Sequence, residues 1–326
     1  MNKKQRSKLL FTCVILVLVL VMLYSGLQIL ESTVFFEGKG TLQTTSKTIT
    51  RNGVKYYPRQ DITVVLVMGI NQTGKVEPTE FNHGGAVDML ALLILDKKTE
   101  AATVLSLNRD MMVDMPVLNR TGKEVDIFNG QLAYSHTYGD GMEVSCENVR
   151  KTVSNLLYGL QIDYYISINM NTISLLNDAV GGVPVTIVDD FSAVTSDLPK
   201  GDLVLNGAQA VTYLQTRWDV GDELNLSRME RHKVYINSFA PAFKEKAKKD
   251  AEFAVNTYDS ITDYIVTDCT LPIFSRLVSD YSEYPLKEIL TIEGDNVLKG
   301  DYYEFYADEE ALDALILKLF YAPKEK

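Results

Sequence analysis

The sequence predicts one mixed α/β domain, held to a membrane by an N-terminal anchor. Segments with the pattern of strands alternate along the chain with segments of helical periodicity, and no internal repeat interrupts them. The composition, 46% hydrophobic and 23% charged in 326 residues, is typical of a globular protein with a sizeable core. Residues 9–30 carry no charge, whereas four of the eight residues before them are Lys or Arg. These three observations together favour an anchored α/β protein.

The N-terminal charge pattern predicts how the chain is divided across a membrane. An uncharged span of 22 residues is long enough to cross a bilayer, which needs about 20. Because basic residues stay on the cytoplasmic side, residues 1–8 are expected to form a cytoplasmic tail and residues 9–30 a single-pass anchor in the cell membrane. Residues 31–60 then form a polar connector, and residues 61–326 an extracellular domain. A cleaved signal peptide is the competing interpretation, but its apolar region would be shorter, roughly 7–15 residues.

The charge of the exported part argues against a nucleic-acid partner. The whole chain has a formal net charge of −11, and the tail accounts for four positive charges, so −15 remains for the rest. Phosphate backbones are bound by clustered Lys and Arg, which an acidic domain lacks. Cys146 and Cys269 are far apart and lack the spacing of a metal site, so we expect buried thiols, with one disulfide as the alternative.

The first half of the domain is expected to contain three strands. Residues 62–70 are apolar almost throughout and predict a buried strand, followed by a loop over 71–85 with Gly, Pro and Asn. Residues 89–95 and 102–107 are two further apolar runs, and the polar residues 96–100 between them predict a β-hairpin. Antiparallel pairing would bring Asp88 close to Asn108, Arg109 and Asp110. Two carboxylates and a guanidinium at one point indicate a metal or phosphate site, and a structural ion pair is the alternative.

Helical periodicity and capping residues predict the remaining elements. Asn206 is a suitable N-cap for a helix ending near Gln215, and Pro241 is expected to kink or interrupt the long helix after it. His136 lies in an expected loop, where a polar surface position is the ordinary outcome. The helices are expected over residues 143–158, 172–180, 206–215, 225–249 and 309–321, and the strands over 164–168, 183–188 and 302–306.

A second candidate site lies between the two helices that flank residue 220. Arg217 follows the first helix, and Arg228 and Arg231, three residues apart, share one face at the start of the second. Helix N-termini bind phosphate, and arginine binds it in bidentate fashion. The alternative is that these arginines are solvated and paired with nearby acidic residues. Trp218 is expected to pack on Arg217 rather than on a sugar.

These motifs, in this order, resemble the LytR-CpsA-Psr proteins of Gram-positive cell envelopes. The resemblance covers about residues 61–240 and extends to the N-terminal anchor. The matching blocks are Gly69-Ile70-Asn71, Val87-Asp88-Met89-Leu90, Ser106-Leu107-Asn108-Arg109-Asp110, Asp178-Ala-Val-Gly-Gly-Val183, Gln215-Thr216-Arg217 and Arg228-Met229-Glu230-Arg231. The family's fold is built around a central mixed sheet flanked by helices, with a hydrophobic tunnel for a polyprenyl chain.

The resemblance implies a phosphotransferase that moves a glycopolymer from a polyprenyl-pyrophosphate lipid to peptidoglycan. Asp88, Arg109 and Asp110 would be catalytic, with Asp110 orienting Arg109 or the hydroxyl nucleophile. Asp88 and Asn71 would hold Mg²⁺, or Mn²⁺ in its place. The residues that would bind the pyrophosphate are Arg109, Gln215, Arg217, Arg228 and Arg231.

Several positions depart from the family pattern and leave a second function open. Asn71 and Asn225 stand where the family has Asp, Ala86 and Gln215 where it has Arg, and Met89 where it has Thr. Asn71 can supply an oxygen ligand to Mg²⁺, but it lacks the negative charge of Asp. We therefore expect metal binding to be weakened, or lost if Asn71 does not coordinate the ion. A single arginine can contribute a factor on the order of 10³–10⁵ to phosphoryl transfer. The alternative is therefore a non-catalytic member that binds polyprenyl pyrophosphate or glycan and assists an active paralogue.

Overall fold

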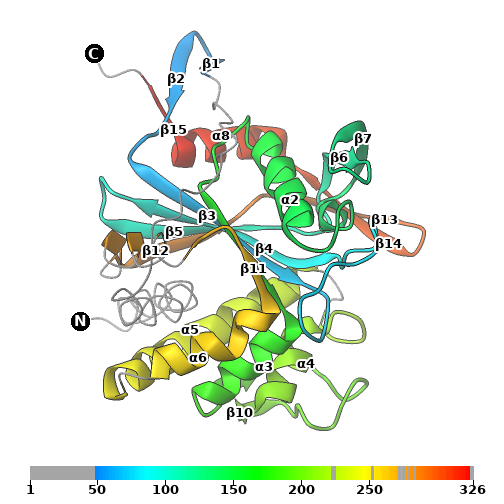
Figure 1. Cartoon of the computed structure of the whole chain (residues 1–326), viewed down its shortest axis with the longest axis vertical. Coiled ribbons are helices and arrows are strands. Elements are labelled where there is room, and N and C mark those ends of the chain that lie inside the picture. The colour runs from blue at the N-terminus through cyan, green and yellow to red at the C-terminus, as the bar shows by residue number, and fades with distance from the viewer. Residues whose placement is uncertain are drawn as a thin grey trace.

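A six-stranded mixed sheet forms the centre of the protein (Figure 1). The computed structural model describes residues 48–221, 225–250, 253–270, 273, 276–277, 280–281 and 284–323. In spatial order the sheet strands are β11 (Ile265–Thr267), β8 (Tyr164–Asn169), β3 (Ile62–Ile70), β4 (Val87–Asp96), β5 (Ala101–Leu107) and β12 (Leu286–Thr291). The β3–β8 and β5–β12 pairs are parallel and the others are antiparallel. The predicted mixed α/β class is confirmed.

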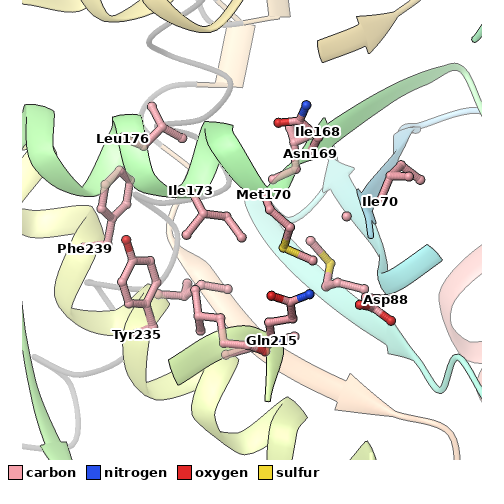
Figure 2. Close-up of a pocket in the computed structure, with 15 residues that line it drawn as sticks. Ile70, Asp88, Ile168, Asn169, Met170, Ile173, Leu176, Gln215, Tyr235 and Phe239 are labelled. Carbon is pink, nitrogen blue, oxygen red and sulfur yellow. Dashed lines mark hydrogen bonds between the residues drawn. The ribbon is translucent and has the colours of Figure 1, made fainter. Parts of the chain in front are cut away.

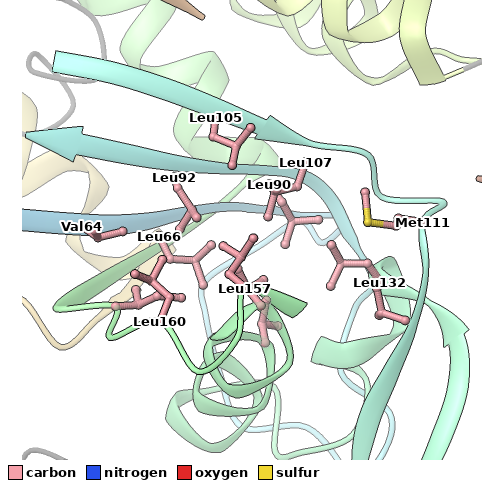
Figure 3. Close-up of a cluster of buried hydrophobic side chains, with 14 of the residues drawn as sticks. Val64, Leu66, Leu90, Leu92, Leu105, Leu107, Met111, Leu132, Leu157 and Leu160 are labelled. Atoms are coloured by element: carbon pink, nitrogen blue, oxygen red, sulfur yellow. The ribbon is translucent and has the colours of Figure 1, made fainter. Parts of the chain in front are cut away.

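Helices cover both faces of the sheet, because its central strands are apolar on both sides. On one side lie α2 (Glu143–Leu156) and α8 (Glu309–Phe320), and on the other α3 (Met170–Ala179), α4 (Gly207–Gln215), α5 (Asn225–Lys249) and α6 (Phe253–Ile261) (Figure 1). Alternate residues of β3 point to opposite faces, so Leu66 joins the core under α2 and α8, whereas Val67 joins the core on the other face. Figure 3 shows the first core, where Leu92 and Leu157 meet Leu66.

Smaller sheets surround the central one. The antiparallel pairs are β6 (Met112–Leu118) with β7 (Glu124–Gln131), β9 (Val183–Ile187) with β10 (Gly201–Leu205), and β13 (Gly294–Lys299) with β14 (Tyr302–Ala307). Short 3₁₀ helices are η1 (Leu132–His136) and η2 (Thr262–Tyr264). The β9–β10 pair, α3, α4 and α5 enclose a second core of their own.

The last part of the predicted connector forms strands of the folded domain. Within residues 31–60, β1 (Ile49–Arg51) and β2 (Val54–Pro58) form a sheet with β15 (Tyr321–Pro323) near the other end of the chain. Tyr321 pairs with Pro58, and Ala322 with Tyr57. Residues 49–58 therefore belong to the domain. The tail 1–8, the anchor 9–30 and the connector up to residue 47 lie outside the described residues. Across the described ranges, no helix is both long and apolar enough to span a bilayer.

Several local predictions can be compared with the structure directly. Cys146 and Cys269 are buried free thiols, as expected. The helix α5 continues through Pro241, so the expected interruption does not occur. His136 is 1% exposed, and its Nδ1 lies 2.8 Å from the Gly85 carbonyl oxygen, so the predicted surface position is wrong. Burial lowers the pKa of His136 to about 4.

Candidate functional site

The β4–β5 hairpin brings Asp88 beside Arg109 at one edge of the central sheet, as its turn predicts. Leu90 pairs with Leu107, and Asp88 and Arg109, two positions beyond this pair on either strand, lie next to each other. A register shift adds to this: Gly69 pairs with Met89 and Ile70 with Val87, which leaves Asp88 opposite no residue of β3. Such a bulge re-aims a side chain and is common next to functional sites.

Asp88 holds two arginines that come from distant parts of the chain. Its Oδ1 is ion-paired with Nη1 of Arg109 and lies 3.6 Å from Nη1 of Arg228. Nη2 of Arg228 also donates to the Asp88 carbonyl oxygen at 3.1 Å. Asp88 is 7% and Arg228 2% exposed, so water screens this network little.

Asp110 holds a third arginine, Arg217, which lies two residues beyond the end of α4. The two guanidinium nitrogens of Arg217 lie 3.2 and 2.9 Å from the two carboxylate oxygens of Asp110. The backbone at Asp110 is held in turn, because its N–H donates to Asn108 Oδ1 at 3.0 Å. Trp218 stacks on Arg217 as predicted, with the guanidinium carbon 5.0 Å from the ring centre, and remains 48% exposed.

Capping and amide contacts fix the two helices that carry the arginines. Asn206 begins α4 with a capping box: its side chain accepts from Gln209 N, and the Gln209 side chain accepts from Asn206 N. At the start of α5, Asn225 accepts from Arg228 Nη2 at 2.6 Å and donates to Asn108 Oδ1 at 3.0 Å. The first turn of α5 is therefore tied to the end of β5.

This cluster carries more positive than negative charge in a buried place. Arg109, Arg217 and Arg228 face Asp88 and Asp110, which leaves a net charge of +1. Burial, together with the neighbouring arginines, lowers the pKa of Arg228 to about 9, and burial lowers that of Arg109 as well. Among the described residues, the Nε atoms of Arg109 and Arg228 are buried and donate no hydrogen bond. Such a cluster is suited to an anion that brings negative charge and acceptor oxygens.

The structure gives Arg231 a different set of partners from the one predicted. Its Nε donates to the Tyr213 carbonyl oxygen at 3.0 Å, its Nη1 pairs with Asp189 at 2.7 Å, and its Nη2 donates to the Thr216 carbonyl oxygen. These contacts fasten α5 to the end of α4. Arg231 thus positions the segment that carries Arg217, and its own donors are occupied by protein.

An apolar cavity opens beside the arginine cluster. Asp88 and Gln215 line one part of it, and the rest is formed mainly by side chains of α3 and α5. In Figure 2, Asp88 lies at one end of the labelled side chains, and Leu176 and Phe239 lie at the other. The apolar and aromatic wall includes Ile70, Ile168, Met170, Ile173, Leu176 and Phe239. Sequence periodicity did not distinguish these residues from ordinary core.

A partly buried histidine, His232, also lines this cavity and was missed in the sequence. His232 Nε2 lies 2.9 Å from the Leu214 carbonyl oxygen. Burial, with Arg228 nearby, lowers the pKa of His232 to about 3, so the ring stays neutral. In the sequence, His232 directly follows Arg231 in a predicted helix, and no motif there indicates that it lines a cavity.

The predicted metal ligands do not fit a Mg²⁺ or Mn²⁺ site in this arrangement. The carboxylate of Asp88 faces two guanidinium groups, and Asn71 Oδ1 accepts a hydrogen bond from Gln215 Nε2 at 3.0 Å. Mg²⁺ prefers carboxylate and phosphate oxygens that are free to coordinate it. No group of three or more His, Cys, Asp or Glu side chains that could hold a metal ion occurs in the part of the chain that the structure describes.

Sequence relatives with names that refer to cell-wall polymers or biofilms match most of the chain. The chain is 25% identical over 259 residues to a protein of Oceanobacillus iheyensis named polyisoprenyl-teichoic acid–peptidoglycan teichoic acid transferase TagU, covering 78% of this chain and 74% of that one. It is 27% identical over 265 residues to biofilm regulatory protein A of Streptococcus mutans, covering 77% of this chain and 61% of that one.

Solved structures share the fold. TagV of B. subtilis superposes with a TM-score of 0.58 at 21% identity, over 80% of this chain and 96% of TagV. A structure described as TagT bound to LI-WTA gives a TM-score of 0.58 at 21% identity, over 86% of this chain and 98% of TagT. The model of the LytR_cpsA_psr family matches residues 32–319, which is most of the sequence. The chain therefore belongs to the LytR_cpsA_psr family.

Proposed function

We propose that this protein attaches a glycopolymer, delivered on a polyprenyl-pyrophosphate lipid, to peptidoglycan. The observation that carries the proposal is the largely buried cluster of Arg109, Arg217 and Arg228, which borders an apolar cavity through Asp88. An apolar cavity next to a buried excess of positive charge is suited to a ligand with an apolar chain and an anionic head. Relatives named as teichoic acid transferases support the same chemistry.

The proposed ligand would lie with its lipid chain in the cavity and its pyrophosphate against the arginines. Pyrophosphate oxygens would accept hydrogen bonds from the Nε atoms of Arg109 and Arg228, which donate none within the protein. The negative charge of the pyrophosphate would offset the repulsion among Arg109, Arg217 and Arg228. Trp218, half exposed beside Arg217, would be near the first sugar that follows the pyrophosphate.

The proposed reaction is a substitution at phosphorus. An oxygen of a peptidoglycan hydroxyl forms a bond to the phosphorus that bears the glycopolymer. The bond from that phosphorus to the bridging oxygen breaks, polyprenyl monophosphate leaves, and the hydroxyl proton is released. Negative charge builds up on the phosphoryl and bridging oxygens, so arginines fixed in advance lower the barrier. Asp88 and Asp110 have the role of holding Arg109, Arg217 and Arg228 in position.

A non-catalytic role in binding lipid or glycan for an active paralogue is the second candidate. It is favoured by one observation: both carboxylates of the cluster are paired with arginines, so neither is free to accept the hydroxyl proton. Both candidate functions require binding of the lipid, but only the transferase forms a product.

The proposal places the domain outside the cell, on a single-pass anchor over residues 9–30. The charge pattern of residues 1–30 supports this placement. A reporter enzyme that is active only outside the cell, fused to the C-terminus, would test this placement. An extracellular domain gives a signal, whereas a cytoplasmic domain gives none.

A transfer assay with the full chain in liposomes tests the reaction. The liposomes would contain a polyprenyl-pyrophosphate-linked oligosaccharide, with peptidoglycan added outside. We expect release of polyprenyl monophosphate together with sugar bound to peptidoglycan, and loss of both with Asp88→Ala, which frees Arg109 and Arg228. Lipid binding without either product would establish the non-catalytic role instead.

A further inference from the structure

A hydrogen bond between two side-chain amides stands where the resemblance places a metal-binding carboxylate. Asn71 directly follows β3, and Gln215 is the last residue of α4. They are 144 residues apart in the chain, and Gln215 Nε2 donates to Asn71 Oδ1 at 3.0 Å. We propose that this neutral Asn71–Gln215 pair lets the arginine cluster bind a pyrophosphate without a divalent cation.

The charges around the pair already favour an anion over a cation. The cluster carries a net charge of +1 without any ligand, and a divalent ion would raise it to +3. Asp88 is the nearest carboxylate on the cavity wall, and its oxygen is bound by Arg109 and approached by Arg228. A cation next to Asp88 would have to displace these arginines or lie against their charge, which is unfavourable in a buried place.

Two of the departures from the family pattern are explained together by this contact. The resemblance gives Asp at position 71 and Arg at position 215, whereas this chain has an amide at both. Exchanging an acid and a base for two amides leaves the net charge of the site unchanged and keeps one hydrogen bond. The exchange removes a carboxylate that could coordinate a metal ion. We therefore interpret the differences at positions 71 and 215 as one coupled change, not as two independent losses.

The pair also keeps the geometry that the site needs. The Asn71 backbone N–H donates to the Ala86 carbonyl oxygen at 2.9 Å, which fixes the end of β3 next to the start of β4. The Gln215 carbonyl oxygen lies 3.5 Å from Arg228 Nη1. The amide contact thus links the strand that precedes the site to the helix end that carries Arg217, without adding charge.

The test measures binding of geranylgeranyl pyrophosphate to the full chain in detergent micelles. Isothermal titration calorimetry would be run in millimolar Mg²⁺ and again in excess EDTA. For the unchanged protein we expect dissociation constants that differ by less than about threefold between the two buffers. Because the inference rests on the proposed pyrophosphate ligand, the transfer assay above is run in parallel.

Variants at the two positions should make the site depend on a cation. Asn71→Asp adds a negative charge facing the pyrophosphate, so affinity in EDTA should fall by about tenfold and recover in Mg²⁺. Gln215→Glu should have the same effect as Asn71→Asp, because it places the added negative charge at the other position of the pair. Asn171→Asp is the matched control: Asn171 accepts from Gly74 N–H at 2.7 Å, away from the arginines, and its change should leave both values unaltered.

Each outcome decides the inference. Binding by the unchanged protein only when Mg²⁺ is present would overturn it while leaving the transferase proposal intact. Equal binding in both buffers without transfer would support it and reject the transferase proposal. No binding in either buffer would overturn the inference and the proposed ligand together. An equal loss with Asn171→Asp would show that net charge alone, and not the amide pair, controls affinity.

Discussion

At the scale of single residues, the site consists of arginines held by aspartates. Arg217 is fixed through both of its terminal nitrogens by Asp110, and Arg109 and Arg228 are held by Asp88. The guanidinium plane is needed for such bidentate contacts, and an ammonium group supplies only a point charge. Charge alone would therefore not reproduce this site.

We expect Arg217→Lys to lower the rate of transfer by at least about 100-fold, since a lysine keeps the charge and loses the paired geometry. Arg59→Lys is the matched control: Arg59 is also mostly buried and contacts two aspartates, Asp61 and Asp96, at 2.8 and 2.9 Å, but it lies outside the site. Rates would be measured with the liposome assay. Similar rates for the two variants would show that bidentate geometry at Arg217 is unimportant.

At the scale of elements, sequence patterns located the strands and helices that are long and regular. The expected strand over 62–70 and the hairpin over 89–107 match β3, β4 and β5, because burial on both faces leaves a continuous apolar run. The strand β7 was missed, since six of its eight residues are exposed and it shows no alternation. The pairing of Asp88 with Arg109 followed from the turn, but the contacts of Gln215 with Asn71 and of Arg231 with Asp189 join distant segments, and no local pattern encodes them.

The turn between α3 and β9 contains two glycines with unequal surroundings. Both have positive φ, 85° at Gly181 and 96° at Gly182. A Cβ at Gly182 would lie 2.7 Å from Val204 Cγ1 and 3.0 Å from the Leu205 carbonyl oxygen, whereas at Gly181 the nearest atom is 3.8 Å away. The second glycine is therefore needed for close packing as well as for its backbone angle.

For Gly181→Ala we expect a loss of about 1–2 kcal/mol in the free energy of unfolding, from the backbone angle alone. Gly182→Ala should cost at least about 3 kcal/mol, because the overlap with β10 is added. Urea denaturation of both variants measures the difference. Equal losses would mean that β10 moves aside without cost.

At the scale of the whole molecule, a buried histidine links stability to pH. His136 joins η1 to the loop before β4 through Gly85, and burial lowers its pKa from 6.5 to about 4. The unfolded chain therefore binds a proton below about pH 6.5 that the folded protein does not bind. Its contribution to stability is present above pH 6.5 and is lost as the pH falls toward 4.

We expect His136→Asn to make stability less dependent on pH, because Asn can donate to the Gly85 carbonyl oxygen and does not titrate. Between pH 7.5 and pH 5 the unchanged protein should lose up to about 2 kcal/mol more than the variant. Urea denaturation at both pH values gives the two differences. An identical loss in both proteins would show that other groups, such as His232, whose pKa is also lowered, control the response to acid.

At this scale, the apolar cavity and the arginine cluster lie side by side, where one lipid pyrophosphate could occupy both. The cavity lies between the sheet and the helices α3 and α5. The arginines come from the segments that follow β5 and α4 and from α5, so one ligand would contact all of them. A crystal structure of the protein with geranylgeranyl pyrophosphate tests this most directly. We predict phosphate oxygens about 3 Å from the guanidinium nitrogens of Arg109, Arg217 and Arg228, with the chain between Met170 and Phe239. A pyrophosphate bound elsewhere, with the three arginines unchanged, would contradict the account.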